Sequence, residues 1–166
     1  MPRVHLEPFG PDDFGLVEQL MGDPAMTEFL GGPESPEKLA DRHRRYAQPD
    51  SGMFKIVDDE TGQAVGSVGF WEREWRGGRV YETGWSVIPA FQRRGIAAEA
   101  TRQAIELARA SGRHRYMHAF PKTENEASNA ICRKLGFECL GEHDFEYPPG
   151  HPIRCNDWRF DLFRSG

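Results

Sequence analysis

The sequence predicts a protein of the mixed α and β class that forms one domain over residues 1–166. The length of 166 residues is typical of a single domain with its own apolar core. Short alternating segments at 54–58, 64–71 and 79–88 follow one another, which predicts consecutive antiparallel strands. Helical spacing of apolar residues then alternates with further short strands towards the C-terminus. No repeat, low-complexity tract or linker divides the chain.

The first third of the chain predicts one strand and two helices. Residues 3–8 alternate as a strand, and Pro11 with two aspartates suits the start of a helix. A helical apolar stripe follows, made of Phe14, Val17, Leu20 and Met21. A second helix is expected to begin after Ser35 as its N-cap and to end near Gln48, and residues 29–33 between the two helices form a loop.

The middle of the chain predicts three strands and a long helix. In the strand at 64–71, Gly66 and Gly69 leave room for a closely approaching neighbour. The strand at 79–88 ends at Pro89, and a helix follows over about 95–110. The residues expected on the buried face of this helix are Ile96, Ala97, Ala100, Ala104, Leu107 and Ala108.

The last third predicts strands at 115–120, 137–142 and 157–163 and one helix at 125–135. Gly136 suits the position just after the helix, where a left-handed backbone conformation is common. The residues spaced for burial on this helix are Ala127, Ala130, Ile131 and Leu135. A proline-rich loop at 147–152 precedes the last strand.

Composition excludes several classes of protein. The formal charge of −5 argues against a general nucleic-acid-binding module, which needs a basic surface to displace counterions from phosphates. The three cysteines, Cys132, Cys139 and Cys155, lack CxxC spacing, so neither a disulfide framework nor a zinc knuckle is indicated. The N-terminus lacks the apolar core of a signal peptide, and no stretch has the length of a membrane span. We therefore expect a reduced, cytoplasmic protein.

The segment that carries chemistry is a strand, a short polar loop and a helix, over residues 81–97. A helix N-terminus offers unpaired N–H donors and a partial positive charge, so a loop that enters it can hold a phosphate. Gly95 allows close approach of the backbone, and Arg93 and Arg94 add full charges. Residues 85–115 carry a net charge of +4, which leaves −9 for the rest of the chain. A solvated turn with two arginines is the alternative interpretation.

Other phosphate-binding loops do not match this chain. The sequence has no GxxxxGK[ST] motif, which disfavours a nucleoside triphosphatase, and no GxGxxG after a strand, which disfavours a dinucleotide site.

The loop resembles that of the GCN5-related N-acetyltransferases (the GNAT family). Gln92-Arg93-Arg94-Gly95-Ile96-Ala97 is similar to the acetyl-CoA loop of that family, [QR]-x-x-G-x-[GA]. The run from Asn125 to Phe137, with Asn-x-x-Ser and then Lys-Leu-Gly-Phe, resembles the branch that acetylates the N-termini of ribosomal proteins. Leu6-Glu7-Pro8 and Asp23-Pro24-Ala25-Met26 are also similar to that branch, so the resemblance covers nearly the whole chain.

The resemblance implies a fold and a binding site for acetyl-CoA. The fold is a mixed, mostly antiparallel sheet of about six to seven strands, with two splayed central parallel strands and about four flanking helices. The pantetheine arm would pair with the backbone of Trp85, Ser86 and Val87, and the amides of residues 93–97 would hold the pyrophosphate. Asn125 would contact the pantetheine arm, and Arg133 would reach the nucleotide end.

The same resemblance suggests residues for proton transfer. Acetyl transfer needs a neutral amine, and amines have pKa values of about 8 to 10.4, so a base must remove a proton. Glu82 is the candidate base, because family members of this branch often carry Glu at this position. Many members have a Tyr as the acid where this chain has Cys132, so Ser128 is the candidate proton donor. A solvated Glu82, a purely hydrogen-bonding Ser128 and a donor role for Tyr147 stay open as alternatives.

Other constellations are weaker. His114 and His118 lie four apart on a strand, so they do not form a helical metal-binding pair. His143, His151 and Cys155 would need a closed loop to hold a metal, and we expect no metal. Cys132 has helical spacing for burial as a small apolar residue, and no nucleophile motif of a hydrolase is present. The aromatics Trp71, Trp75, Tyr81 and Trp85 serve either core packing or the wall of an acceptor pocket.

We therefore expect an acetyl-CoA-dependent N-acetyltransferase acting on a primary amine. The alternative is a non-catalytic acyl-CoA-binding or sensor module of the same fold. The acceptor stays open between protein N-termini, small amines and antibiotics, because a fold does not fix a substrate. The charge of −9 outside the loop segment favours a cationic acceptor through electrostatic steering. The oligomeric state also stays open, with a homodimer as one alternative.

Overall fold

Each expected strand and helix is present, although several begin or end elsewhere along the chain. The computed structural model of the protein describes residues 2–147 and 149–164. Within them the strands are β1 (Val4–Pro8), β2 (Met53–Asp58), β3 (Ala64–Trp75), β4 (Gly78–Val87), β5 (Tyr116–Ala119), β6 (Glu138–Glu146) and β7 (Pro152–Asp161). The helices are α1 (Phe14–Met21), α2 (Pro36–Tyr46), α3 (Ile96–Ser111) and α4 (Glu126–Lys134), with a short 3₁₀ turn, η1 (Pro89–Phe91), after β4. In the described ranges no helix is long and apolar enough to cross a membrane.

The strands form one sheet in the hydrogen-bonded order β1-β2-β3-β4-β5-β7-β6. Strands β4 and β5 pair in parallel. The pairs β1–β2, β2–β3, β5–β7 and β6–β7 are antiparallel. A mixed, mostly antiparallel sheet with four helices among the described residues is the predicted fold class, which is thereby confirmed.

The chain groups into two compact units. Unit 1 consists of Met1–Gly69 and Trp85–Gln103, and unit 2 consists of Phe70–Gly84 and Ala104–Gly166. Strands β3 and β4 and helix α3 each contribute residues to both units. The site is therefore described below separately for each unit.

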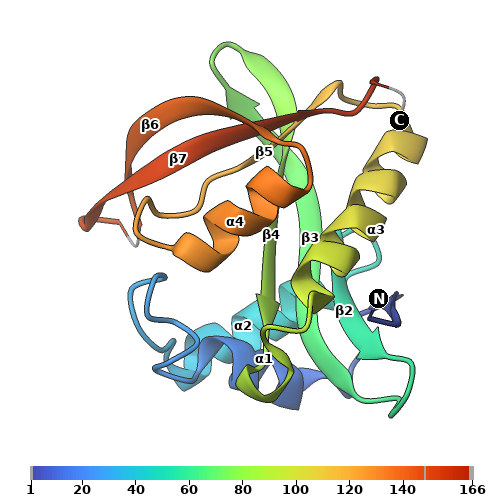
Figure 1. Cartoon of the computed structure of the whole chain (residues 1–166). Coiled ribbons are helices and arrows are strands. Elements are labelled where there is room, and N and C mark those ends of the chain that lie inside the picture. Colours follow the sequence, from blue (N-terminus) through green and yellow to red (C-terminus); the bar gives the residue numbers. More distant parts are fainter. Residues whose placement is uncertain (1, 148, 165–166) are drawn as a thin grey trace. The chain divides into compact units, whose positions relative to one another are not determined.

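Unit 1 places its largest fully buried apolar side chains on α1, β2 and β3. They are Val17, Leu20, Ile56, Val65 and Val68. Helix α1 lies beside α2, where the ring of Phe14 meets that of His43 edge-on at 5.8 Å between centroids (Figure 1). A Cβ atom at Gly66 would lie 2.2 Å from the carbonyl oxygen of Ser86, and one at Gly69 would lie 2.2 Å from the sulfur of Met53. The predicted close approach at both glycines is thus confirmed.

Unit 2 joins α4 to β7 through a buried amide. Asn129 donates to the carbonyl oxygens of Lys122 and Asn125, at 3.0 and 2.8 Å. Its own Oδ1 accepts from Asn156 and from the indole of Trp158, both at 2.8 Å. Because every polar atom of this buried side chain is satisfied, Asn129 fixes α4 against β7.

Several details of the helices differ from the predictions. On α4, Ala127 and Ala130 are exposed, whereas Asn129 and Cys132 are buried. On α3, Leu107 is 45% exposed because it lies at the edge of the buried stripe, whose members are Ile96, Ala98, Ala100, Thr101, Ala104, Ile105 and Ala108. Asp13 precedes α1, and its carboxylate accepts from the Gly10 N–H at 2.6 Å and from Lys55. The last strand, β7, also begins earlier than predicted, at Pro152.

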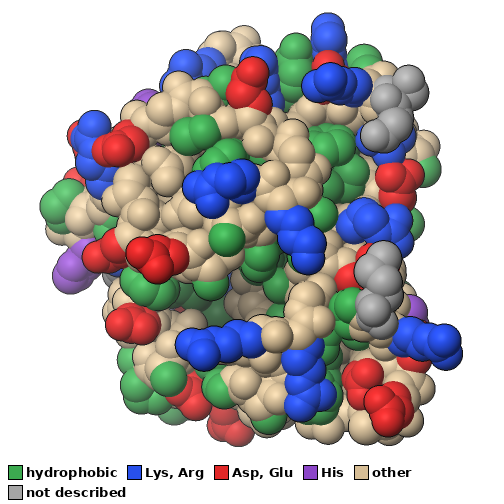
Figure 2. All heavy atoms as spheres, viewed as in Figure 1, with side chains coloured by type: hydrophobic (Ala, Val, Ile, Leu, Met, Phe, Trp, Pro, Cys, Tyr) green, Lys and Arg blue, Asp and Glu red, His purple; other side chains and the backbone are tan. Residues whose placement is uncertain are grey.

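Most arginines of the described residues are paired with carboxylates. Figure 2 shows Lys and Arg side chains beside Asp and Glu at several places on one face. The twelve paired arginines are Arg42, Arg44, Arg45, Arg73, Arg76, Arg79, Arg102, Arg109, Arg113, Arg115, Arg154 and Arg159. Exposed pairs of this kind contribute little to stability, on the order of 0–1 kcal/mol each.

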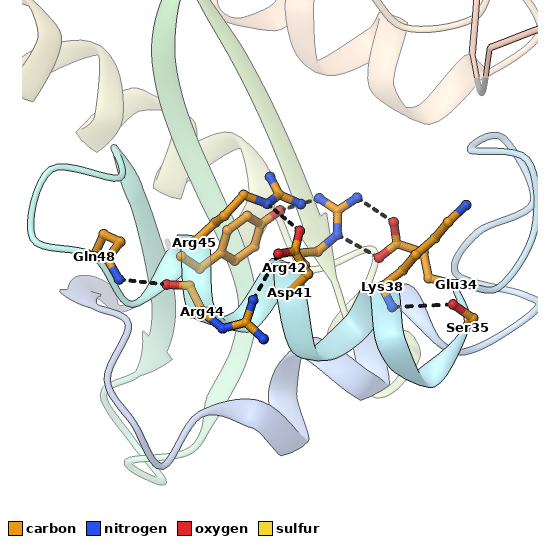
Figure 3. A network of polar contacts seen from close by, with 9 residues as sticks. Glu34, Ser35, Lys38, Asp41, Arg42, Arg44, Arg45 and Gln48 are labelled. Carbon is orange, nitrogen blue, oxygen red and sulfur yellow. Dashed lines mark hydrogen bonds and ion pairs between the residues drawn. The ribbon is translucent and has the colours of Figure 1, made fainter.

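The pair between Arg42 and Glu34 is the best shielded of those in unit 1 (Figure 3). Arg42 donates to both carboxylate oxygens of Glu34 at 2.7 Å and to the hydroxyl of Tyr46 at 2.9 Å. The two side chains are only 14% and 18% exposed. Ser35 caps α2 as predicted, accepting from the N–H of Lys38 at 3.3 Å. The pair therefore ties the segment before α2 to the body of the helix.

We expect Glu34→Gln to lower the free energy of unfolding by about 1–2 kcal/mol in urea denaturation at neutral pH, because it removes a bidentate, charge-assisted contact. Arg44→Gln is the matched control, since its pair with Asp41 is exposed and its loss changes stability by less than about 0.5 kcal/mol.

The same pair predicts a dependence on pH. The hydrogen bond from Arg42 holds the pKa of Glu34 below its ordinary value and outweighs the opposing effect of burial. A pKa that is lower in the folded state gives stability that is present above the unfolded pKa and is lost as the pH falls through the folded one. The stability difference between wild type and Glu34→Gln should thus shrink in acid. A difference that stays constant down to acid unfolding would contradict this assignment.

Candidate functional site

The loop between β4 and α3 has a backbone that is fixed by local contacts. After η1, the side-chain amide of Gln92 turns back and donates to the carbonyl oxygen of Val87 at 2.8 Å. Arg93 has a φ of 63° and Gly95 a φ of 80°, both in the left-handed region. Glycine adopts this region freely, whereas it costs a residue such as Arg93 on the order of 1–2 kcal/mol. The loop thus keeps an arginine where a glycine would be less strained.

The loop ends at a helix N-terminus with free donors. Among the described residues, Glu99 is the first of α3 whose N–H reaches a carbonyl one turn back, that of Gly95 at 3.1 Å. The N–H groups at 96–98 precede this bond, as in the first turn of any α-helix. Ile96 and Ala98 are buried, which fixes the direction in which the helix starts. Unit 1 therefore offers a cluster of backbone donors at the positive end of the α3 dipole.

Arg93 and Arg94 differ from most other arginines of the protein. Both are exposed, and neither forms an ion pair with any residue in the ranges 2–147 and 149–164. The guanidinium of Arg94 lies 4.9 Å from the centre of the Phe91 ring, which leaves its N–H groups free to bind an anion. The two charges therefore stand beside the free amides of α3 without a partner carboxylate.

Strand β4 has an incomplete edge. It pairs with β5 at two positions of the described chain, Tyr81 with Met117 and Glu82 with His118. Beyond Glu82 the strand continues to Val87, and the N–H of Ile88 bonds to the carbonyl oxygen of Val65 on β3 at 2.9 Å. Residues 85–87 thus have a strand partner on one side only.

The candidate residues of unit 2 on α4 lie at its two ends. Asn125 is the N-cap of the helix, and its Oδ1 accepts from the N–H of Ser128 at 3.1 Å. Ser128 is half-buried, and its hydroxyl makes no hydrogen bond to the described residues. Arg133 is exposed in the last turn, with its guanidinium 5.7 Å from the centre of the Trp158 ring. Asn125 and Ser128 are therefore brought together, whereas Arg133 lies about two turns along the helix.

Glu82 is paired with an arginine that sequence reasoning missed. Arg73 on β3 donates to Glu82 Oε1 at 2.7 Å, and the two side chains are 30% and 23% exposed. The guanidinium also lies 4.9–5.2 Å from the ring centres of three aromatic residues, Trp75, Phe120 and Phe145. Glu82 is thus partly buried and ion-paired, and one of its carboxylate oxygens already accepts a hydrogen bond from Arg73.

A buried histidine and aspartate stand next to Glu82 in the sheet. His118 Nδ1 lies 2.6 Å from Asp157 Oδ1, and both side chains are almost completely buried. Asp157 Oδ2 accepts from the indole of Trp75 at 3.0 Å and lies 3.6 Å from Arg76. Burial raises the pKa of Asp157, but the hydrogen bonds from His118 and Trp75 together with nearby positive charge, Arg76 included, outweigh it and hold that pKa below its ordinary value. Asp157 is therefore held as a carboxylate.

Sequence reasoning missed both pairs because their members lie far apart along the chain. Arg73 sits in the charged run Glu72-Arg73-Glu74, which is typical of a solvated hairpin. The predicted strand alternation does place His118 between two residues of the opposite face. The one local signal for Asp157 is an acidic residue directly before the buried Trp158.

The remaining residues singled out in the sequence are Cys132, His143 and Tyr147. Burial raises the pKa of the Cys132 thiol to about 12, so the predicted role as a small buried residue is confirmed. His143 packs on the rings of Trp75 and Phe145, and the described residues contain no group of three His, Cys, Asp or Glu side chains suited to a metal. Tyr147 is exposed, and its backbone N–H donates to the carbonyl oxygen of His151. Pro148 in this loop lies outside the described residues.

Three of the four aromatics singled out in the sequence have different neighbours. Tyr81 packs edge-on against Phe70 and His114 and bonds to Ser111 Oγ at 2.8 Å. Trp75 instead packs against Phe120, Phe145 and His143. Trp71 lies against Gly84, where an added Cβ would be 3.3 Å from its ring. Of the four, Trp75 is the one beside Arg73.

Comparison with known proteins agrees with this geometry. An acetyltransferase (GNAT) domain model matches residues 3–138. A GNAT acetyltransferase from Bacillus anthracis superposes with a TM-score of 0.83 at 18% identity, covering 98% of this chain and 96% of that one. An acetyltransferase from Salmonella typhimurium, solved with its cofactor acetyl-CoA, has a TM-score of 0.75 at 19% identity and coverages of 100% and 96%. A ribosomal-protein-alanine N-acetyltransferase from Brucella melitensis gives 0.74 at 20% identity, with coverages of 96% and 99%.

These structures share the fold, and the family model covers most of the sequence, including the loop from Gln92 to Ala97. The chain therefore belongs to the GNAT acetyltransferase family.

Proposed function

We propose that the protein is an acetyl-CoA-dependent N-acetyltransferase that transfers an acetyl group to a primary amine. The observation that carries the proposal is the pair of unpaired arginines, Arg93 and Arg94, at the start of α3 and directly after an incomplete strand edge. The Salmonella typhimurium structure of the same fold was solved with acetyl-CoA. In this proposal residues 1–166 act as one catalytic domain in the cytoplasm, where the three free cysteines stay reduced.

The residues present fit the chemistry of this cosubstrate. The backbone of Trp85, Ser86 and Val87 can pair with an extended chain that carries amides, as an added strand does. The amides of residues 93–97 and the two guanidinium groups match a diphosphate. Gln92 supports the loop from behind through its bond to Val87. Gly95 has no side chain in this stretch, so the backbone can approach the ligand closely.

Unit 2 holds further candidate residues for the reaction, Asn125, Ser128 and Arg133 on α4. Asn125 has a free amide donor, because its Oδ1 is used for the helix cap. We assign that donor to the pantetheine arm. Ser128 has an unengaged hydroxyl in the first turn of α4, and Arg133 is an exposed cation without an ion pair among the described residues. We assign the first to proton donation to the departing thiolate and the second to the nucleotide end.

The reaction proceeds by direct attack. The amine enters as an ammonium ion and gives one proton to Glu82, the proposed base. The nitrogen lone pair then attacks the thioester carbonyl carbon, and the carbon–sulfur bond breaks. The thiolate leaves with the electron pair of that bond and takes a proton from Ser128, which recovers one from the acylated nitrogen. The third proton of the ammonium ion stays on the amide product.

Protein N-termini are the acceptor class that we place first. The sequence motifs resemble those of the ribosomal-protein branch, and a ribosomal-protein-alanine N-acetyltransferase shares the fold. An α-amine has a pKa of about 8, so it loses its proton more readily at neutral pH than a lysine does.

Release of free CoA should be measured with acetyl-CoA and a panel of N-terminal peptides, lysine peptides and small amines. We expect turnover with at least one α-amine, and mass spectrometry should find the acetyl group on that nitrogen. The alternative, a non-catalytic acyl-CoA-binding module, predicts binding of acetyl-CoA in calorimetry and no release of thiol with any amine.

Loss of either loop arginine should weaken cosubstrate binding. We expect Arg93→Asn and Arg94→Gln each to raise the Kd of CoA about tenfold in calorimetry, equivalent to about 1.4 kcal/mol. Asn tolerates the left-handed region, so Arg93→Asn should leave the melting temperature unchanged or higher. Arg44→Gln removes an equal charge from α2 and should leave the Kd unchanged. An equal rise in Kd for all three variants would show that CoA binding depends only on the net charge of the protein and not on the loop.

Glu82→Gln should slow acetyl transfer. A general base contributes about 10²–10⁴-fold, so we expect kcat to fall at least about a hundredfold with an unchanged Kd for acetyl-CoA. Glu72→Gln is the matched control, because Glu72 is also paired with arginine but lies in a more exposed position. If turnover and its pH profile were the same in Glu82→Gln as in wild type, Glu82 would not be the base.

A further inference from the structure

The buried pair of His118 and Asp157 has no role in the scheme above. A buried ion pair is a weak source of stability, since apolar residues of similar size often serve as well. Titratable groups that are buried with a specific charged partner are instead frequent at catalytic sites. The surroundings of the pair therefore bear on the reaction.

The hydrogen bonds fix which nitrogen of His118 carries a proton. Asp157 is held as a carboxylate, which accepts hydrogen bonds and cannot donate them. His118 Nδ1, 2.6 Å from Oδ1, must then be the donor. In the neutral ring the other nitrogen, Nε2, has a lone pair and no proton. The aspartate thus prepares the imidazole to accept a proton at Nε2.

Nε2 is also not completely buried, although the His118 side chain is only 4% exposed. It makes no hydrogen bond to any residue in 2–147 or 149–164. Every fully buried side-chain nitrogen or oxygen in those ranges does have a partner. Nε2 is therefore not sealed inside the unit, although the ring as a whole is buried.

His118 lies beside Glu82 on the same face of the sheet. The two residues are register partners on β4 and β5, and partners in a parallel pair point to the same side. Asp157 and Cys155 share one side of β7, because they are two residues apart.

The other charged groups near the pair come from neighbouring strands and loops. Arg73 is bound to Glu82, and Arg76 lies 3.6 Å from Asp157. Lys122 lowers the pKa of Cys155 and is paired with Cys155 by an isolated bridge. His143 is the register partner of Cys155 on β6. Among these neighbours, no acid contacts His118 besides Asp157.

We propose that His118, positioned by Asp157, receives the amine proton from Glu82 and releases it to solvent. This role rests on the proposed acetyl transfer. A carboxylate is a weak base for an ammonium ion, and one oxygen of Glu82 is already bound to Arg73. In the relay the ammonium N–H bond breaks as an O–H bond forms on Glu82. A water molecule between the two side chains then carries that proton to Nε2, where the N–H bond forms, and solvent takes it as the products leave.

The test is the pH dependence of kcat for His118→Gln, with His114→Gln as the matched control. Gln can still donate to Asp157 but cannot hold a proton. His114 lies four residues earlier and contacts Glu72 and Tyr81. We expect kcat of His118→Gln to fall at least about tenfold and to lose one ionisation on the acid side, with an unchanged Kd for acetyl-CoA. His114→Gln should keep the wild-type profile.

The outcomes separate the two proposals. Turnover by His118→Gln with the wild-type profile would overturn the relay and leave the proposed function standing. Absence of turnover by wild type with any amine would overturn the proposed function and the relay with it. If His118→Gln does not fold, ¹⁵N NMR of the wild-type protein decides. The relay requires a proton on Nδ1 and a free lone pair on Nε2 in the resting protein. A proton on Nε2 throughout would overturn it.

Discussion

The structure depends on the short parallel pairing between β4 and β5. Every strand in a sheet must satisfy its backbone N–H and C=O groups, and β4 does so on the β3 side as far as Ile88. On the other side the pairing with β5 consists of two described positions, ending at Glu82. The stretch from Trp85 to Val87 is thus a strand edge without a second strand. In the proposed function an extended, amide-bearing cosubstrate completes that edge.

The end of β4 also determines where positive charge is available. The chain leaves the strand at Val87, turns through η1, and enters α3 after only four loop residues. Two of those four are arginines, and neither has a carboxylate partner in the described chain, whereas twelve other arginines do. Arg93 also lies in the left-handed region, where Gly or Asn would fit with less strain. The loop therefore keeps this positive charge at a cost in backbone strain. A protein of net charge −5 thus keeps unpaired positive charge at one loop.

Local patterns predicted those parts of the fold and site that depend on neighbours in sequence. The loop from Gln92 to Ala97, the N-cap at Ser35 and the close approach at Gly66 each follow from a few adjacent residue types. The pairs Arg73–Glu82 and His118–Asp157 join residues on different strands, so they depend on register. Register is set by the whole sheet, and no short window of sequence contains it. The predicted burial of Leu107 was wrong for a similar reason. Helical spacing places this residue on a face of α3, but it does not say how wide the buried stripe on that face is.

In the proposed function, the pairing of Glu82 with Arg73 bears on how the acceptor amine loses its proton. An ammonium ion that approaches Glu82 meets a carboxylate with a guanidinium already bound, and the two cations repel each other. A neutral amine meets no such repulsion. The arrangement therefore favours acceptors that give up a proton early, and it requires that the proton leave the carboxylate again. In the proposed relay His118, the register partner of Glu82 on the same face of the sheet, receives that proton.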